Sequence, residues 1–223
     1  MSARIRKAAI PARNSPKSQA TRARIMQTAT DFISERGSTD FQMNEISERC
    51  NLSKGSLYYY FIDKAGLMEA VFDQVIGDLV VRVEEAVGLA STSYEAIARI
   101  VMTLVGCIRV ERPIVFAMVE ELFLPPSAGS AHSCGRFARV LELLEGHLDR
   151  AKDEGLLVSD LDSRLAANAI AGACIYNALA FADEGERGKP IEDIVQRYLM
   201  LVMNGAATEK GREAIRSYDG TGS

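Results

Sequence analysis

Apolar residues recur at the helical period along most of the chain. A first helix from about Gln19 to Gly37 would bury one face, formed by Ile25, Ala29, Phe32 and Ile33. Glycine is a natural residue to end it, because it adopts the left-handed conformation at low cost. No segment sustains the apolar–polar alternation of a strand. The sequence therefore predicts an all-α fold of about nine helices without an internal repeat.

Two short helices are expected next, over about 42–50 and 53–60, with a tight turn at Asn51. Asparagine tolerates the left-handed conformation that such a turn needs, and Ser53 can cap the second helix. The residues at buried spacings are Met43, Ile46, Cys50 and Leu57. This arrangement predicts a helix-turn-helix.

Longer helical patterns fill the rest of the chain. Helices are expected over about 63–87, where Asp63 can cap the start, and over about 93–110. Further helices are expected from Pro113, over about 135–154, over an alanine-rich segment that ends at about 183, and from Pro190. The expected division is a flexible basic arm (1–18), the helix-turn-helix domain (19–64), a larger helical domain (65–205) and a tail (206–223).

Four consecutive aromatic residues occupy the second short helix and its end: Tyr58, Tyr59, Tyr60 and Phe61. Consecutive helical residues point about 100° apart, so the three tyrosines cannot share one buried face. We expect Leu57 and Phe61 in the core and Tyr58 and Tyr59 outside. Exposed tyrosines beside Lys54 and Lys64 suit DNA, because lysine donates to guanine acceptors and to phosphates.

Charge is distributed unevenly between the two parts of the chain. The net charge is −4, yet residues 1–64 hold 11 Lys/Arg against 6 Asp/Glu, a local charge of +5. The first 24 residues hold seven basic side chains and no acidic one. A basic arm on an acidic body is typical of polyanion binding, while a merely solvated tail is the alternative reading.

Candidate chemistry for catalysis or metal binding is sparse. The four cysteines are widely spaced and read as reduced thiols, and the two histidines lie in no zinc or nucleophile motif. We therefore expect no enzyme activity, no cofactor and no metal site. The amino terminus has no secretory signal and no segment makes a convincing membrane span, so a cytoplasmic protein is expected.

The stretch from about Thr21 to Val75, with "LSKGSLYYYFIDKAGLMEAV", resembles the DNA-binding domain of tetracycline-repressor (TetR) family regulators. The resemblance covers about a quarter of the chain and makes 53–60 the recognition helix. It implies DNA contacts at Asn44, Lys54, Gly55, Ser56, Tyr58, Tyr59 and Lys64. Two positions depart from the family pattern: Asn51 replaces the usual turn glycine, and Gln42 replaces a Ser or Thr cap.

The same resemblance implies a homodimer that binds a palindromic double-stranded DNA operator and responds to a small-molecule effector. The expected pocket lining is Met102, Arg109, Phe116, Met118, Glu120, Phe123, Tyr176 and Asn177. The expected dimer interface is Ala166, Ile170, Ala173, Asn177, Ile194, Tyr198 and Leu201. Each of these residues could instead be ordinary core, and Glu120 or Glu121 could contact a cationic ligand or only brace the fold.

The most direct functional reading is a repressor that an apolar or amphipathic molecule releases from its operator. Two alternatives stay open at this point. A redox regulator would use Cys107, Cys134 or Cys50 as its trigger. A helical interaction module would lack a ligand response and would show no salt-dependent DNA binding.

Overall fold

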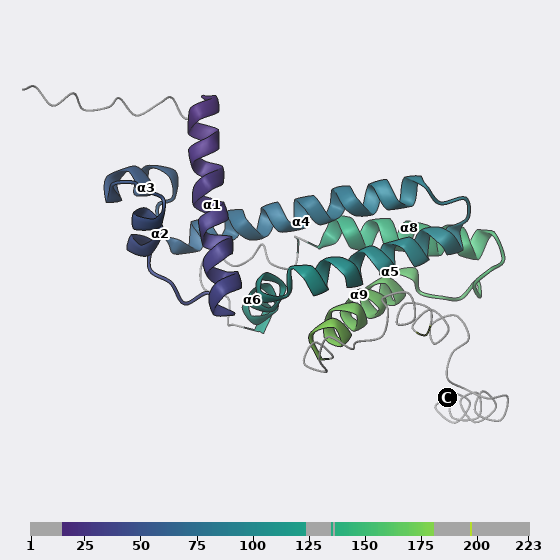
Figure 1. The fold of residues 1–223 in the computed structure, drawn as a ribbon. Helices are drawn as coiled ribbons and strands as arrows, with labels where there is room; N and C mark the ends of the chain where they lie inside the picture. The colour runs from purple at the N-terminus through teal and green to yellow at the C-terminus, as the bar shows by residue number, and fades with distance from the viewer. Residues whose placement is uncertain (1–14, 124–134, 136, 181–196, 198–223) are drawn as a thin grey trace, which may run out of the picture. The chain divides into compact units, whose positions relative to one another are not determined.

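The computed structural model describes residues 15–123, 135, 137–180 and 197. Over these residues it contains eight α-helices and no strand, as the helical periodicity predicts (Figure 1). The described residues form two compact units. Unit 1 comprises those within 1–80 and 111–138, and unit 2 those within 81–110 and from 139 onwards.

Helix α1 of unit 1 spans Pro16–Arg36 and begins slightly before the expected Gln19. Ser15 caps it by accepting the Ser18 N–H at 3.2 Å, and the proline at the first position has no N–H to satisfy. Gly37 ends the helix at φ 66°, with its N–H bonded to the Ile33 carbonyl at 2.8 Å. The buried face is the one that the sequence predicts.

The helix-turn-helix of unit 1 is formed by α2 (Met43–Arg49) and α3 (Lys54–Tyr60). Asn51 takes the left-handed conformation with φ 49°, and Ser53 caps α3 by accepting the Ser56 N–H at 3.2 Å. Helix α2 packs against α1 and α3 against α2 (Figure 1). The turn and its cap are therefore confirmed.

Two further helices contribute to unit 1. Helix α4 spans Lys64–Gly88, capped at its start by the Asp63 carboxylate, which accepts the Gly66 N–H at 2.8 Å. It belongs to unit 1 up to Val80 and to unit 2 from Val81. Helix α6 (Arg112–Phe123) packs against α1. Unit 1 thus includes a segment that the sequence assigns to the larger helical domain.

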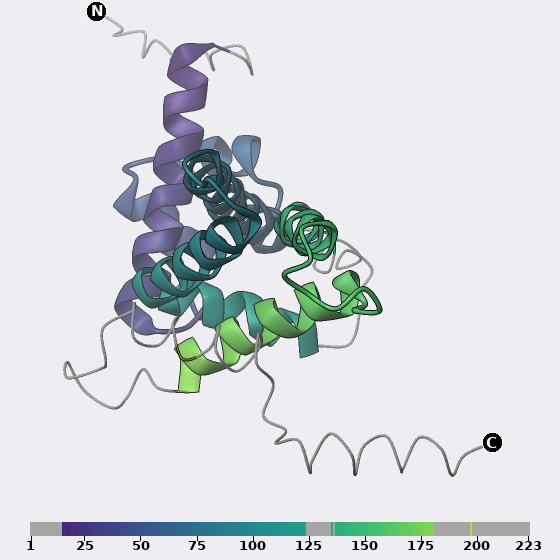
Figure 2. The ribbon, with the colours of Figure 1, turned by 90° about the vertical axis from the view of Figure 1, so that its right-hand side faces the viewer.

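Unit 2 contains α5 (Ser93–Val110), α8 (Ala138–Asp153) and α9 (Ser163–Ala180). Helix α9 packs against α5, and the chain turns after α8 back into α9 (Figure 2). Polar contacts fix the helix ends: the Ser93 hydroxyl donates to the Glu154 carboxylate at 2.6 Å, and Arg139 pairs with Glu84 at 2.8 Å.

The helix expected from Pro190 and the tail lie outside the described residues. No helix over the described part of the chain has both the length and the apolar character needed to cross a membrane.

Candidate nucleic-acid interface

Helix α3 is anchored by two apolar residues, one turn apart. Leu57 and Phe61 are 1% and 5% exposed, and the Phe61 N–H donates to the Leu57 carbonyl at 3.1 Å. The Leu52 N–H donates to the Ser47 carbonyl at 2.8 Å, which ties the turn to α2. The inner face of this short helix is therefore fixed, as the sequence predicts.

The opposite face of α3 points to solvent. Lys54 and Gly55 are exposed, and Tyr58 is 48% exposed. Tyr59 and Tyr60 are half-buried and their rings meet edge to face, with centroids 5.2 Å apart. The outward face of α3 thus consists of a lysine, a glycine and a tyrosine, with Tyr59 less exposed than expected.

Two predicted DNA contacts lie outside α3. Asn44 is exposed on α2. Its backbone carbonyl accepts the Ser47 hydroxyl at 2.8 Å, so this hydrogen bond does not involve the Asn44 side chain. Lys64 is half-buried at the start of α4, and its ammonium lies 4.6 Å from the Phe41 ring centroid. Ser56, the remaining predicted contact, shares a 2.8 Å hydrogen bond with the Ser53 hydroxyl.

A brace that sequence reasoning missed joins α1 to α2. Arg36 pairs with Glu45 and Arg49 with Glu35, and both guanidinium groups lie over the Phe32 ring, at 4.5 and 4.8 Å from its centroid. Hydrogen bonds from the arginines hold the pKa of each carboxylate below its usual value.

Glu45 also compensates for the weak cap at Gln42. Its carboxylate accepts the Gln42 backbone N–H at 2.7 Å, which is one half of a capping box. The spacing of a glutamate three residues after the cap position was the signal available in the sequence. The start of α2 is therefore held without a Ser or Thr.

The cations of unit 1 differ in whether a carboxylate balances their charge. The charges of Arg36 and Arg49 are balanced by carboxylates. Lys17, Arg24 and Lys54 are exposed and have no side-chain partner within the described residues. These three remain available to a polyanion.

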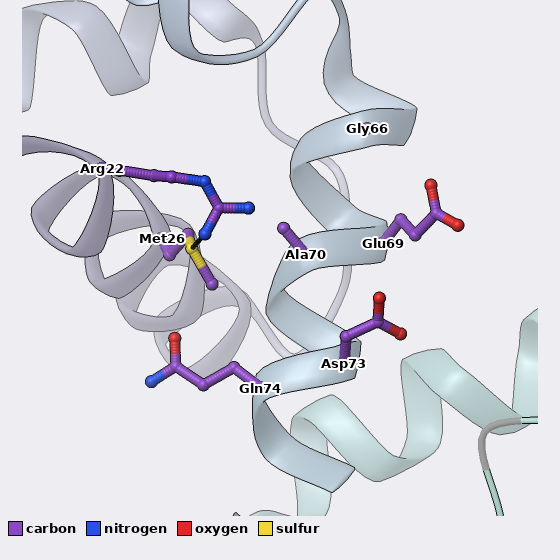
Figure 3. Close-up of a pocket in the computed structure, with 7 residues that line it drawn as sticks. All are labelled: Arg22, Met26, Gly66, Glu69, Ala70, Asp73 and Gln74. Atoms are coloured by element: carbon purple, nitrogen blue, oxygen red, sulfur yellow. Dashed lines mark hydrogen bonds between the residues drawn. The ribbon is translucent and has the colours of Figure 1, made fainter. Parts of the chain in front are cut away.

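A shallow cleft of about 500 Å³ lies between α1 and α4 in unit 1 (Figure 3). Arg22 extends from α1 toward α4, and its guanidinium donates to the Met26 sulfur at 3.1 Å. The cleft is lined by Arg22, Met26, Gly66, Glu69, Ala70, Asp73 and Gln74. None of these was among the expected pocket residues.

The expected pocket residues do not fall in one unit. Phe116, Met118 and Glu120 belong to unit 1, and Met102, Arg109 and Tyr176 to unit 2. Met118 is buried, whereas the other five are exposed. The side chains of Phe123 and Asn177 lie outside the described set, so the pocket stays a prediction.

The expected dimer residues on α9 lie mainly toward the interior of the protomer. Ile170 is 2% exposed, while Ala166 and Ala173 are half-buried. The exposed stripe of α9 is a different one, with Leu165 and Tyr176 at 68% and 72% exposure and Ala169 and Gly172 between them. Ile194, Tyr198 and Leu201 lie outside the described residues.

Comparison with known proteins gives matches over both short and long stretches. Residues 25–71 match the family described as "Bacterial regulatory proteins, tetR family". The fatty acid metabolism regulator protein of Bacillus subtilis is 25% identical over 155 residues, covering 66% of this chain and 76% of the relative. The repressor KstR2 of Rhodococcus jostii is 21% identical over 199 residues, covering 89% and 97%.

Solved structures share the fold. The regulator FadR from Bacillus subtilis, crystallised with stearoyl-CoA, superposes with a TM-score of 0.71 at 20% identity, covering 83% of this chain and 99% of that one. KstR2 of Mycobacterium tuberculosis gives a TM-score of 0.62 at 20% identity, covering 84% and 95%. The all-α fold expected from the sequence is thereby confirmed.

Proposed function

We propose that this chain, a member of the tetR family of bacterial regulatory proteins through residues 25–71, is a cytoplasmic homodimeric repressor released from its DNA operator by an apolar or amphipathic effector. One observation carries the DNA-binding part. Helix α3 is anchored by Leu57 and Phe61 and presents Lys54, Gly55 and Tyr58 to solvent. No catalytic role is assigned to any residue.

Each outward residue has a role that its chemistry supports. Lys54 donates to guanine acceptors in the major groove, and Tyr58 packs on sugar and donates its hydroxyl to phosphate. Gly55 has no Cβ to hold the α3 backbone away from the DNA. Asn44 is suited to a bidentate contact with adenine, and Lys64 to a phosphate contact.

A dimer is needed because one seven-residue helix reads too little DNA. Two copies related by a twofold axis read two half-sites, about 34–36 Å or one helical turn apart. The exposed stripe of α9 supports this part of the proposal. Leu165, Ala169, Gly172 and Tyr176 follow a spacing of four, three and four residues, which is that of a helix-packing seam.

The effector class rests on two kinds of support. Met102 on α5 and Phe116 on α6 are exposed apolar side chains. One related protein is a regulator of fatty acid metabolism, and one related structure contains stearoyl-CoA. An effector that lowers DNA affinity tenfold needs to favour the DNA-incompetent state by only about 1.4 kcal/mol.

The related regulators give no support to a thiol-redox trigger. Cys50 and Cys174 are buried, and burial raises the pKa of the Cys174 thiol to about 12. A thiol in that state is a poor nucleophile. Cys107 is half-buried and accepts a hydrogen bond from Arg82 at 3.4 Å, and Cys134 lies outside the described residues.

The proposal is tested by selecting duplexes from a random pool with the purified protein and measuring their affinity by fluorescence anisotropy. We expect an enriched palindrome whose affinity falls steeply with salt. The absence of any enriched sequence, or salt-independent binding, would favour the interaction module instead.

The effector is tested on the selected duplex with stearoyl-CoA, stearate and coenzyme A. Release by a molecule with an acyl chain, and none by coenzyme A, supports an amphipathic effector. If all three leave the affinity unchanged, the proposed effector class is wrong while DNA binding still stands.

A further inference from the structure

Arg22 occupies the junction between the first helix and the end of the recognition helix. It belongs to the basic run of the first 24 residues, which by sequence alone reads as a set of phosphate contacts. Its guanidinium instead lies 5.0 Å from the centroid of the Phe61 ring, and one of its nitrogens donates to the Met26 sulfur. Arg22 therefore lies over Phe61, the residue that directly follows the last residue of α3.

Phe61 is buried and hydrogen-bonded to the last turn of α3. It is 5% exposed and its N–H closes the last turn of α3 on Leu57. Tyr60 directly precedes it, and Tyr58 lies one turn back on the outward face. A shift of the Phe61 ring would tilt the residues that face the groove.

The cleft beside Arg22 gives its side chain room to take this position. Two of the α4 residues that line the cleft, Gly66 and Ala70, carry little or no side chain, and the other three are Glu69, Asp73 and Gln74 (Figure 3). A Cβ at Gly66 would meet only the Asp63 carboxylate, at 3.4 Å. The two small residues therefore leave room in the cleft beside Arg22.

The other cations on the same helix behave differently. Lys17 and Arg24 are exposed, as Arg22 is, but they have no side-chain partner within the described residues. Arg36 is paired with Glu45. Arg22 alone among these four lies over the aromatic residue that ends α3.

We propose that Arg22 is a positioning residue that sets the orientation of α3 through Phe61, and that it does not contact phosphate. This inference rests on the proposed DNA binding and names a residue that acts on it indirectly. Loss of Arg22 should weaken binding of the dimer to the selected operator about five- to thirtyfold, which is about two- to fivefold for the one surface cation–π contact that each protomer loses.

The test compares Arg22→Gln with the wild type on two duplexes, the selected operator and a shuffled sequence, over a range of salt concentrations. A positioning residue gives weaker operator binding, unchanged binding to the shuffled duplex and an unchanged salt slope. A phosphate contact would weaken both duplexes and reduce the slope by about 1.8 for the dimer, which is about 0.9 for each of its two protomers. The second pattern, or no effect on either duplex, would overturn the inference.

Two further variants separate positioning from general stability. Arg22→Lys keeps the charge but loses the planar group, so it should lose operator affinity with the slope intact. In a Phe61→Leu background, Arg22→Gln should cost no additional affinity if the two residues act together. Circular dichroism at the assay temperature establishes that each variant is folded, and the salt slope of Arg22→Gln decides the question even if Phe61→Leu does not fold.

Failure of the underlying function gives a different result. If the wild type selects no sequence, the proposed DNA binding is wrong. If the wild type binds and Arg22→Gln reduces the salt slope, only the positioning role is wrong.

Discussion

The Lys64 ammonium lies over the Phe41 ring, so the first residue of α4 contacts the segment that leads into α2. This contact involves the residue before Gln42, and the Arg22–Phe61 contact involves the residue that follows α3. A proposed phosphate contact is therefore already placed by the protein before DNA arrives. Preorganisation of this kind reduces the entropy lost when the complex forms.

Lys64→Met should weaken DNA binding and reduce the salt slope of the dimer by about 1.8, because each protomer loses one phosphate contact while the length of the side chain is kept. Lys64→Arg should retain the slope. Anisotropy titrations at several salt concentrations measure both. An unchanged slope for Lys64→Met would show that this lysine only packs on Phe41.

Gly55→Ala should separate stability from function. In the free protein a Cβ at Gly55 meets no atom within 4 Å, so alanine should stabilise the helix by up to about 1 kcal/mol. The same Cβ should obstruct close approach to the groove and weaken operator binding. Gly77→Ala on α4, which is equally unobstructed, is the matched control and should leave binding unchanged. Tighter binding by Gly55→Ala would contradict the proposed approach.

Glu45→Gln should lower the melting temperature and the affinity for DNA together, because it removes the negative charge that pairs with Arg36, while the glutamine oxygen can still accept the Gln42 N–H. The pKa of Glu45 is lower in the folded protein than its ordinary value. Its contribution to the free energy of unfolding is therefore present at a pH above that ordinary value, and is lost as the pH falls through the folded pKa. Thermal melts at neutral and acidic pH measure this. Glu48→Gln, on the exposed side of α2, should change neither quantity.

His147 should make unit 2 sensitive to mild acid. It is 7% exposed and its Nδ1 has no hydrogen-bond partner within the described residues. Burial first, and then Arg150, lowers its pKa, while Glu154 opposes the shift. The part of the free energy of unfolding that depends on neutral His147 is therefore fully present above the unfolded pKa of about 6.5, and it is lost as the pH falls below that value.

Urea titrations of the wild type and of His147→Phe, at about one pH unit above and below that value, measure the effect. The wild type should lose stability in the acidic sample and the variant should lose less. Equal losses would show that another group controls this pH range.

Tyr176→Asp and Leu165→Asp should shift the protein toward monomer, because each places a charge in the exposed stripe of α9. Sedimentation velocity at several concentrations measures the change. Leu156→Asp, at an exposed position after α8, is the control and should leave the dimer intact. A dimer that survives both stripe variants would place its interface elsewhere.

Sequence patterns predicted the helices well because each depends on local chemistry. The apolar face of α1, the turn at Asn51 and the cap at Ser53 all follow from residues within one or two turns of each other. Glu45 was available to the same reasoning through its spacing from Gln42. Element bounds in the helix-turn-helix accordingly differ little from those expected.

Contacts between helices were not predictable in the same way. The positions of Arg22 over Phe61 and of Lys64 over Phe41 depend on how α1, α3 and α4 are placed, and long cationic side chains have many rotamers. The apolar pattern of α6 likewise does not reveal that it packs on α1. On α9 the small-residue stripe chosen from the sequence includes Ile170, which the fold buries.

The packing of α6 on α1 has a practical consequence for anyone who would transplant the DNA-reading part onto another scaffold. A piece cut after Val80 would keep every side chain proposed to touch DNA but would strip the cover from one side of α1. A stand-alone headpiece would therefore need either a grafted copy of Arg112–Phe123 or polar replacements on the newly uncovered surface.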